Sequence, residues 1–433
     1  DQGKMPPKRT RAGPGKKESP ATNAPQPEEE EERTRLPLPE GFYGSVLNAK
    51  WSHVLGFPEV DEYEEELVRM EVKEGQRPTQ SWEYKSRGMS FELDGAVEQF
   101  SPPRPWLMVL SSEKGWPYSL QEGTALADCY VTAEAERVWK RLDGFLRMLF
   151  RHSTGGDSDV KRVLLLGTPG IGQSMTVGSY LLYQLLHYDA EQLQVAIYCL
   201  GGELAYVFDK TTQAVTEHEG AGSIVDAIND LSRRGKKGYI VYDVSEEGAP
   251  PPSGLPPDGW GMIVLGSLKQ HNYKALATQL HTGLTVMNCP DEEEVKAMCA
   301  WRKRDCPEQE RNKYYGAVYS RMFYVGPLPR YVLTEAEFNE RTAAVESALQ
   351  AITASAANDY LDRKDGNIWC PKNPFQQLVK IVRESKGCGL EGMRCTDICR
   401  SLGARVAQRL GEVLGSSEGF WRLVSAGDRR LRF

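Results

Sequence analysis

One eight-residue segment, GTPGIGQS at residues 167–174, constrains the fold of this chain more than any other feature. It directly follows an apolar run at residues 163–166 and opens into a helical pattern at residues 175–188. A strand, a glycine-rich loop and a helix in this order are the context that a Walker A phosphate-binding loop, GxxxxGK[ST], requires. The pattern asks for a lysine before its final hydroxyl residue, but this chain has Gln173 there.

The loop can supply most of the chemistry of a phosphate site. Glycines let the backbone approach the ligand, so that consecutive N–H groups point at phosphate oxygens and the following helix adds its positive end. The hydroxyl of Ser174 is a predicted Mg²⁺ ligand. The predicted nucleotide-binding residues are Gly167, Thr168, Pro169, Gly170, Ile171, Gly172, Gln173 and Ser174.

Gln173 replaces a positive charge with an amide that donates only neutral hydrogen bonds. Replacing the lysine by glutamine weakens the free energy of nucleotide binding by about 1–2 kcal/mol, which lowers the affinity about tenfold. Lysine also stabilises charge on the transferring phosphoryl group, so the chemical step should lose more than binding does. We therefore expect weak nucleotide binding and strongly reduced hydrolysis.

Charged residues downstream are candidates for the rest of the site. Asp243 ends an apolar run at residues 239–242, as an aspartate that helps to hold Mg²⁺ does. Asp243, Glu246 and Arg330 are candidate catalytic residues: Glu246 could polarise water or be a solvated loop acid, and Arg330 could contact the γ phosphate. Lys210 is a candidate substitute for the missing lysine, and Ser267 is a candidate γ-phosphate sensor or helix cap.

The glycine loop does not fit the other common nucleotide-binding motifs. Its glycines do not match the dinucleotide fingerprint GxGxxG. The Asn-Lys-x-Asp motif, by which GTPases recognise their base, does not occur either. ATP is therefore the favoured nucleotide.

The order of the elements predicts an α/β fold, a P-loop NTPase-like parallel sheet with helices on both faces. We expect strands at residues 193–200, 239–243, 262–265 and 284–289, a hairpin at 205–216, and helices at 132–152, 223–234 and about 273–280. The predicted organisation is a disordered basic and acidic tail at 1–36, a tryptophan-rich α+β domain at 37–130, the P-loop NTPase-like domain at 131–308, and a mainly helical region at 309–433.

Composition excludes several classes of protein. The 53 Lys and Arg against 60 Asp and Glu give a net charge of −7, so no chain-wide positive charge attracts nucleic acid. No apolar run reaches the roughly 18–20 residues of a membrane span, and no secretory signal is visible. Nine cysteines, an odd number, do not suggest a disulfide framework. We expect a soluble intracellular protein without membrane contact.

Two features have alternative interpretations. Basic residues between residues 4 and 17 resemble a nuclear-import signal, but such a segment can also be a simple solvated tail. The tryptophans at positions 51, 82, 106 and 116 could form a stacking surface for bases, but such residues more often form a core, which we favour.

Several segments together resemble the retrotransposon hot spot proteins of trypanosomes. They are LLLGTPGIGQS at residues 164–174, YIVYDV at 239–244, NCPDEEEVKAMCAW at 288–301 and GPLPRYVL at 326–333. Residues 51–119 resemble the N-terminal domain of that family, so the resemblance covers about residues 45–385. It implies a multigene family with an ATP- or GTP-binding loop, a place in or around the nucleus, and roles in transcription or RNA export.

The resemblance also places the family's functional residues on this chain. The loop glycines fall on Gly167, Gly170 and Gly172, the hydroxyl ligand on Ser174, and the acidic strand end on Asp243. The family's lysine falls on Gln173, which puts catalysis in doubt here. Because members are often longer, we also expect that this chain is shortened at its C-terminus.

Three functional hypotheses follow. The first is a nuclear or perinuclear protein, with the cytoplasm as an alternative location, that binds ATP and Mg²⁺ weakly and serves as a conformational or interaction module for transcription or RNA-export proteins. The second is an active ATPase with a substitute lysine. The third is a scaffold with no nucleotide role that contacts chromatin or RNA machinery; direct nucleic-acid binding is left open.

Overall fold

The computed structural model describes residues 35–56, 70–78, 104–151, 162–244, 249–267, 283–355, 357, 373–385 and 390–415. The predicted tail up to residue 34, the predicted helix at about 273–280, Trp82 and Glu246 lie outside the described residues. Within the described part, no helix combines the length and the apolar character needed to cross a membrane.

The N-terminal part is a small antiparallel sheet with two short helices. Its strands are β1 (Lys50–Gly56), β2 (Met70–Lys73), β3 (Arg104–Ser111) and β4 (Asp128–Val131), in the order β2-β1-β3-β4. Helices α1 (Phe42–Leu47) and α2 (Pro117–Gln121) accompany it. Trp116 is fully buried, and the indole of Trp51 packs on Tyr183 and donates a 3.1 Å hydrogen bond to its hydroxyl. These two tryptophans are packing residues, as favoured from the sequence.

A seven-stranded sheet forms the centre of the molecule, in the order β11-β5-β10-β9-β6-β7-β8. Its strands are β5 (Arg162–Gly167), β6 (Val195–Leu200), β7 (Leu204–Asp209), β8 (Ala214–Glu219), β9 (Gly238–Asp243), β10 (Gly261–Ser267) and β11 (Gly283–Met287). β11, β5, β10, β9 and β6 are parallel, whereas β7 and β8 are added as an antiparallel hairpin. The predicted mostly parallel sheet is confirmed.

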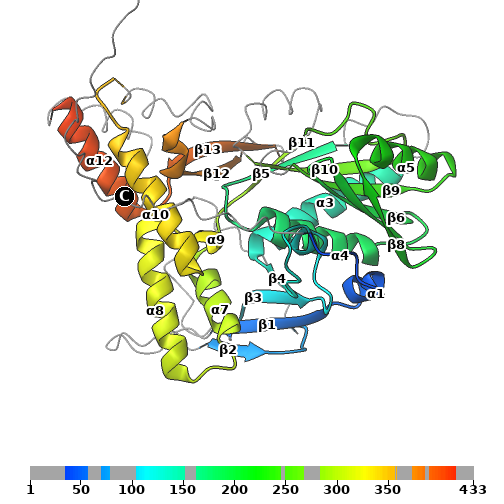
Figure 1. Cartoon of the computed structure of the whole chain (residues 1–433), viewed down its shortest axis with the longest axis horizontal. Helices are drawn as coiled ribbons and strands as arrows, with labels where there is room; N and C mark the ends of the chain where they lie inside the picture. The colour runs from blue at the N-terminus through cyan, green and yellow to red at the C-terminus, as the bar shows by residue number, and fades with distance from the viewer. Residues whose placement is uncertain are drawn as a thin grey trace, which may run out of the picture.

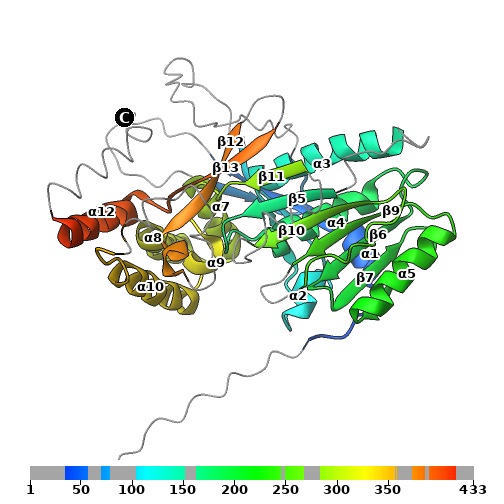
Figure 2. The same cartoon turned by 90° about the horizontal axis from the view of Figure 1, so that it is seen from above.

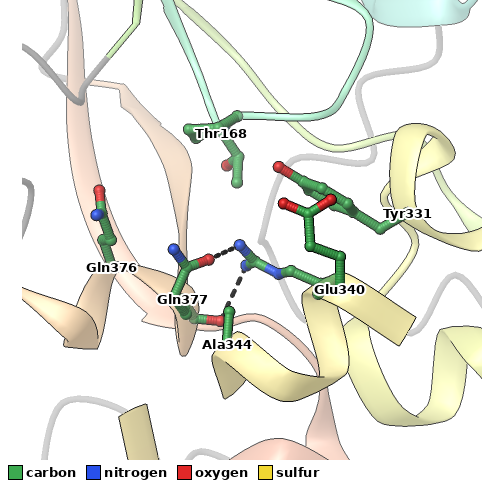
Figure 3. A pocket seen from close by; sticks show the side chains of 8 residues that line it. Thr168, Tyr331, Glu340, Ala344, Gln376 and Gln377 are labelled. Atoms are coloured by element: carbon green, nitrogen blue, oxygen red, sulfur yellow. Dashed lines mark hydrogen bonds between the residues drawn. The ribbon is translucent and has the colours of Figure 1, made fainter. Parts of the chain in front are cut away.

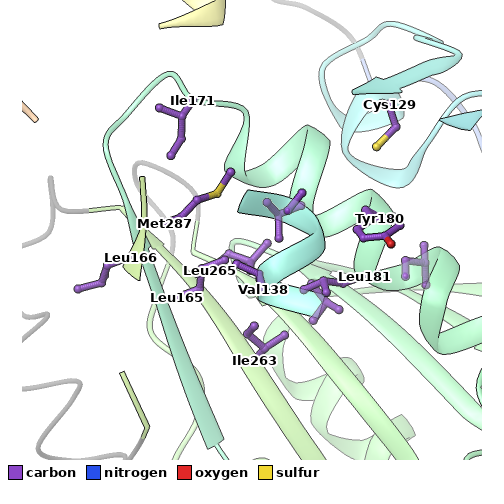
Figure 4. Packing of buried hydrophobic residues seen from close by; sticks show 14 of the residues in the cluster. Cys129, Val138, Leu165, Leu166, Ile171, Tyr180, Leu181, Ile263, Leu265 and Met287 are labelled. Carbon is purple, nitrogen blue, oxygen red and sulfur yellow. The ribbon is translucent and has the colours of Figure 1, made fainter. Parts of the chain in front are cut away.

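Burial explains which strands lie inside the sheet. Every residue of β6 and β9 is buried, as expected for parallel strands that are covered on both faces. β8 at the edge alternates between exposed and half-buried residues, and it is rich in polar side chains that suit an edge strand. Leu165, Ile263 and Leu265 pack from the sheet toward Val138 and Leu181 of the covering helices (Figure 4).

Helices cover both faces of this sheet. The connections through α4 (Ser179–His187) and α5 (Ala221–Arg233) step across the sheet in opposite directions, so right-handed crossovers place the two helices on opposite faces. Figure 1 shows this arrangement, with the N-terminal sheet below α4. The long helix α3 (Ala133–Arg151) lies on the α4 side and matches the helix predicted at 132–152. It is capped by Thr132, whose hydroxyl accepts from the Ala135 amide at 3.3 Å.

The C-terminal part is mainly helical. Its helices are α7 (Glu292–Arg302), α8 (Glu308–Val325), α9 (Pro329–Val332), α10 (Glu335–Gln350), the 3-10 turn η4 (Pro374–Gln377) and α12 (Arg400–Leu414). The hairpin β12 (Val379–Ser385) and β13 (Glu391–Asp397) lies between these helices and β11 (Figure 2). Asp291 caps α7 by a capping box with Glu294.

Candidate nucleotide site

The glycine loop lies at the carboxyl end of β5 and adopts a conformation that needs its glycines. Gly170 and Gly172 have φ values of 92° and 86°, in the left-handed region that side chains disfavour. The carbonyl of Gly172 accepts hydrogen bonds from the amides of Thr176 at 2.7 Å and Val177 at 3.4 Å. The chain therefore leaves the loop as one turn of π-helix, η1 (Gln173–Gly178), before α4 begins.

Backbone N–H groups at the start of this helix are available to a ligand. Within the described residues, the amides of Gly172, Gln173 and Ser174 donate no hydrogen bond. The first N–H groups of a helix have no partner inside the helix, and they carry its positive dipole end. The loop thus presents the donors that an anion such as a phosphate group needs.

The side chain of Gln173 folds back onto the strand that precedes the loop. Its Nε2 donates to the carbonyl of Leu165 at 2.8 Å. A Cβ placed on Gly167 would lie 3.1 Å from Gln173 Oε1 and 2.8 Å from Ile171 Cδ1, so only glycine leaves room for both side chains. The side-chain amide of Gln173 is therefore bonded within the protein, and it carries no positive charge.

Ser174 and Asp243, the two predicted Mg²⁺ ligands, are brought together. Asp243 ends β9 and is only 3% exposed, and the Ser174 hydroxyl donates a hydrogen bond to its carboxylate. Burial raises the pKa of Asp243 to about 6, although hydrogen bonds from Ser174 and Tyr198 lower it and the charge of Glu122 raises it. A hydroxyl and a carboxylate form the hard oxygen donor set that suits Mg²⁺.

Tyr198 of β6 contacts both Ser174 and Asp243 through its hydroxyl. Its hydroxyl donates to the Ser174 carbonyl at 2.9 Å and lies 3.4 Å from Asp243 Oδ2. Burial, followed by the charge of Asp243, raises the pKa of Tyr198 well above its usual value, so the hydroxyl remains a proton donor. The sequence pattern did not single out Tyr198, because a tyrosine in a fully buried strand looks like any other core residue.

The N-terminal and C-terminal parts both reach the loop. The Arg330 amide donates to the Gly170 carbonyl at 3.1 Å, and its guanidinium lies 3.5 Å from the Tyr118 hydroxyl of α2. Burial raises the pKa of Tyr118 to about 12; Glu122 and Asp243 also raise it, and Arg330 lowers it. Arg330 is therefore next to the loop, and Tyr118, which sequence reasoning missed, is near Asp243.

The other sequence candidates divide into three cases. Ser267 ends β10 and is in register with Gly167, which places its backbone at the edge of the sheet that carries the loop. Glu246 falls outside the described residues. Lys210 donates to the carbonyls of Leu185 at 3.3 Å and Tyr188 at 2.5 Å, at the end of α4 that is far from the loop.

The hypothesis that Lys210 substitutes for the missing lysine is therefore not supported by its position. The helix from residue 173 to 187 separates it from the loop, and 15 residues span about 22 Å. Burial lowers the pKa of Lys210 to about 8, and the lysine serves as a cap for helix carbonyls. The sequence predicted the hairpin that holds Lys210 correctly, but it could not show which end of α4 the hairpin meets.

Two of the solved structures that match the chain have low sequence identity and low TM-scores. One is "Structure of C. elegans PCH-2", at 12% identity and a TM-score of 0.31, covering 57% of this chain and 68% of that one. Another is a Signal Transduction ATPase with Numerous Domains protein with a tetratricopeptide repeat sensor from Pyrococcus horikoshii, at 13% identity and a TM-score of 0.19, covering 65% of this chain and 47% of that one. At these TM-scores neither carries an argument about this protein. No curated protein matches the chain.

Two protein-family models match this chain and identify its family. The model described as "Retrotransposon hot spot protein, P-loop domain" matches residues 164–418, which include the loop, Asp243 and Arg330. The model described as "Retrotransposon hot spot proteins N-terminal" matches residues 43–158. The first match alone spans more than half of the 433 residues. The chain belongs to the retrotransposon hot spot protein family.

Proposed function

We propose that this protein binds a magnesium–nucleotide complex weakly through a phosphate loop without its lysine, hydrolyses it poorly, and uses the bound state as a conformational or interaction module. One observation carries the proposal: the free amides of Gly172, Gln173 and Ser174 adjoin the Ser174–Asp243 pair at one edge of the parallel sheet. Among the described residues, no group of three or more His, Cys, Asp or Glu could hold a metal ion alone. That fits Mg²⁺, which binds through few protein ligands together with substrate phosphates.

The identity of residue 173 sets the expected strength of binding. Gln173 lies where a lysine would reach the β and γ phosphates. Its side-chain amide already donates a hydrogen bond to the carbonyl of Leu165, whereas its backbone N–H stays free. A nucleotide must therefore bind without this charge. We infer that Arg330, whose backbone contacts the loop at Gly170, supplies part of the missing positive charge when nucleotide is present.

A magnesium–ATP titration, followed by calorimetry, tests this proposal. The protein itself should bind weakly, and Gln173→Lys should improve affinity at least about tenfold. Gln192→Lys is the matched control, because it adds the same charge at an exposed position at the far end of α4. It should leave affinity unchanged. Ser174→Ala, Asp243→Ala and Arg330→Met should each weaken whatever binding is measured.

The alternatives predict other outcomes of the same titration. Tight binding by both the protein and Gln173→Lys, with turnover of ATP, would support an active ATPase instead. Absence of binding by both would leave a scaffold with no nucleotide role. If Ser174→Ala and Asp243→Ala leave measured binding intact, the proposed Mg²⁺ ligands are wrong.

Family membership supports a further proposal, that the protein acts in or around the nucleus with transcription or RNA-export proteins. The basic residues Lys8, Arg9, Arg11, Lys16 and Lys17, outside the described residues, would serve as an import signal. Fluorescence microscopy of the tagged chain tests this proposal. Replacing all five residues by glutamine should shift the protein from the nucleus to the cytoplasm, and an unchanged distribution would contradict the assignment.

A further inference from the structure

A cavity of about 110 Å³ lies beside the phosphate loop, and Asp243 is not among the residues that line it. The loop contributes Thr168 and Pro169 to its wall, and the remaining lining residues come from α9, α10 and η4: Tyr331, Glu340, Arg341, Ala344, Gln376 and Gln377. Figure 3 shows the side chains of Thr168, Tyr331 and Glu340 converging on one another, with Gln376 and Gln377 on the other side. A water needs roughly 10–15 Å³ of such space, so several waters or one small molecule fit.

The cavity has a buried cation in its wall. Arg341 is 7% exposed, and its guanidinium lies 4.8 Å from the centre of the Tyr331 ring. It donates to the side-chain oxygen of Gln377 and, at 2.9 Å, to the Gln377 carbonyl. Burial lowers the pKa of Arg341, whereas its interaction with the Tyr331 side chain, which includes a hydrogen bond, raises it.

No carboxylate pairs with Arg341 among the described residues. Glu340 lines the same cavity but is exposed and forms no ion pair with it. A buried charge is usually paired, because removing it from water is costly unless an opposite charge compensates. The positive charge of Arg341 is thus balanced only by neutral partners and the face of a ring.

Two further polar atoms at the cavity have no partner. Both Arg341 Nε and Gln376 Oε1 are buried without a hydrogen bond within the described part of the chain. The amide of Gln376 can present either its oxygen or its NH₂ group to a ligand. Unpaired buried groups of this kind mark a place where a water or a ligand completes the hydrogen bonding.

We propose that this cavity binds a small anion that bears a phosphate or carboxylate group, held by the guanidinium of Arg341 and the amide of Gln376. Arginine suits this role because its planar fork matches the oxygens of both groups. Glu340 stands at the same cavity as a negative charge that limits the affinity. The proposal is independent of nucleotide binding, since the cavity lies outside the loop and needs no Mg²⁺.

A ligand bound in the cavity would act on the phosphate loop through the residues that contact Gly170. The Tyr331 ring, on which Arg341 lies, packs against Gly170 so closely that a Cβ there would be 2.6 Å from ring atom Cε2. The next residue back, Arg330, donates from its backbone to the Gly170 carbonyl. A ligand that draws Arg341 toward the cavity therefore acts on a segment that contacts Gly170 through both a ring and a backbone hydrogen bond.

The test measures binding of inorganic phosphate, and separately of malonate, to the full chain without Mg²⁺ or nucleotide, by calorimetry and by the shift in melting temperature. Arg341→Met should reduce affinity at least about tenfold. Glu340→Gln, at an exposed position where folding is not at risk, should raise affinity roughly three- to tenfold. Arg233→Met is the matched control, because that arginine is exposed on α5, and it should have no effect.

The outcomes separate the possibilities. Binding of phosphate alone, with both variant effects, identifies a phosphate-bearing ligand, and binding of malonate alone identifies a carboxylate-bearing one. Binding that neither Arg341→Met nor Glu340→Gln changes would place the anion elsewhere, including in the phosphate loop, and would overturn the proposal. Absence of binding by both anions would overturn it as well. A failed magnesium–ATP titration would leave these results unaffected.

Discussion

At the scale of single residues, we expect the charge of Asp243 to control Mg²⁺ binding at the proposed site. Its pKa is raised to about 6, first by burial, so this carboxyl changes its charge within the range of ordinary buffers. A carboxylate binds Mg²⁺ only when it is ionised. The protonation of one buried side chain is thus coupled to the proposed function.

We predict that magnesium–ATP affinity falls about tenfold when the pH is lowered from 7.5 to 5, because the carboxyl with a pKa of about 6 is then about 90% protonated. Titrations at several pH values measure this fall. In Asp243→Asn the affinity should be low at every pH. An equal pH dependence in Asp243→Asn would show that another group is responsible.

The same pKa predicts an effect on stability of the ligand-free protein. A folded pKa of about 6, above the reference value of 3.8, means that ionisation of Asp243 opposes folding. The cost is absent below pH 3.8, grows between the two values, and is complete above about pH 6. Asp243→Asn should therefore raise the free energy of unfolding by about 1–3 kcal/mol at pH 7.5 and by much less at pH 4. Urea denaturation at both values tests this, and a destabilised variant at pH 7.5 would contradict it.

The sequence predicted the loop glycines, Ser174 and Asp243, because that motif is local and its spacing reflects direct chemistry. It could not predict Tyr331 or Tyr198, since each acts through a contact between segments that are far apart in the chain. Tyr331 excludes any side chain at Gly170, and Tyr198 joins Ser174 to Asp243. Neither tyrosine has a neighbour in sequence that reveals its role.

At the scale of secondary structure, the predicted helix after the loop proved to be two elements. The pattern over residues 175–188 indicated one α-helix, but the structure begins with the π-helical turn η1 and continues as α4. The double acceptor role of the Gly172 carbonyl creates the wider turn. π-helical turns often occur at functional sites, and this one places the Ser174 carbonyl over the Tyr198 hydroxyl.

Gly178, which ends this turn, allows Tyr198 to approach. A Cβ at Gly178 would lie 2.2 Å from the Tyr198 hydroxyl oxygen, and the tyrosine is fully buried, so it cannot move aside. Gly178→Ala should lower the free energy of unfolding by about 1–3 kcal/mol. The matched control is Gly144→Ala in α3, where a Cβ meets no atom within 4 Å.

Because alanine favours helix over glycine, Gly144→Ala should stabilise the protein by about 0.5–1 kcal/mol. Urea denaturation of both variants provides the comparison. Equal effects of the two changes would show that Tyr198 does not press on the π-helical turn.

Most elements of the central sheet were predictable, because each one has a local signal. The apolar runs gave β5, β9 and β10, the Asp209–Thr212 turn gave the β7–β8 hairpin, and Thr132 marked the start of α3. Local signals do not specify the order of strands. That β10 lies between β5 and β9 depends on how the helices fold over the sheet, which only the three-dimensional structure shows.

At the scale of the whole molecule, a buried ion network attaches the C-terminal hairpin to the central sheet. Glu134 of α3 pairs with Arg383 of β12 at 2.7 Å and with Arg137 at 3.1 Å. Arg137 also pairs with Glu391 of β13 at 2.7 Å, and Glu391 accepts from the Val286 amide of β11 at 2.7 Å. β11 pairs with β5, so the network supports the edge of the sheet next to the strand that carries the loop.

Removal of the central acid should be costly, because Glu134→Gln leaves Arg137 and Arg383 buried with less negative charge near them. All three side chains are 7–14% exposed, so solvent screens the loss little. A buried pair that loses one partner costs about 3–5 kcal/mol, whereas an exposed pair contributes about 1 kcal/mol or less. Glu412→Gln breaks such an exposed pair with Arg409 in α12, and it serves as the control. Urea denaturation should show a large loss of stability for Glu134→Gln and almost none for Glu412→Gln. If Glu134→Gln behaves like the control, the hairpin is held by its apolar contacts alone and the network only accompanies them.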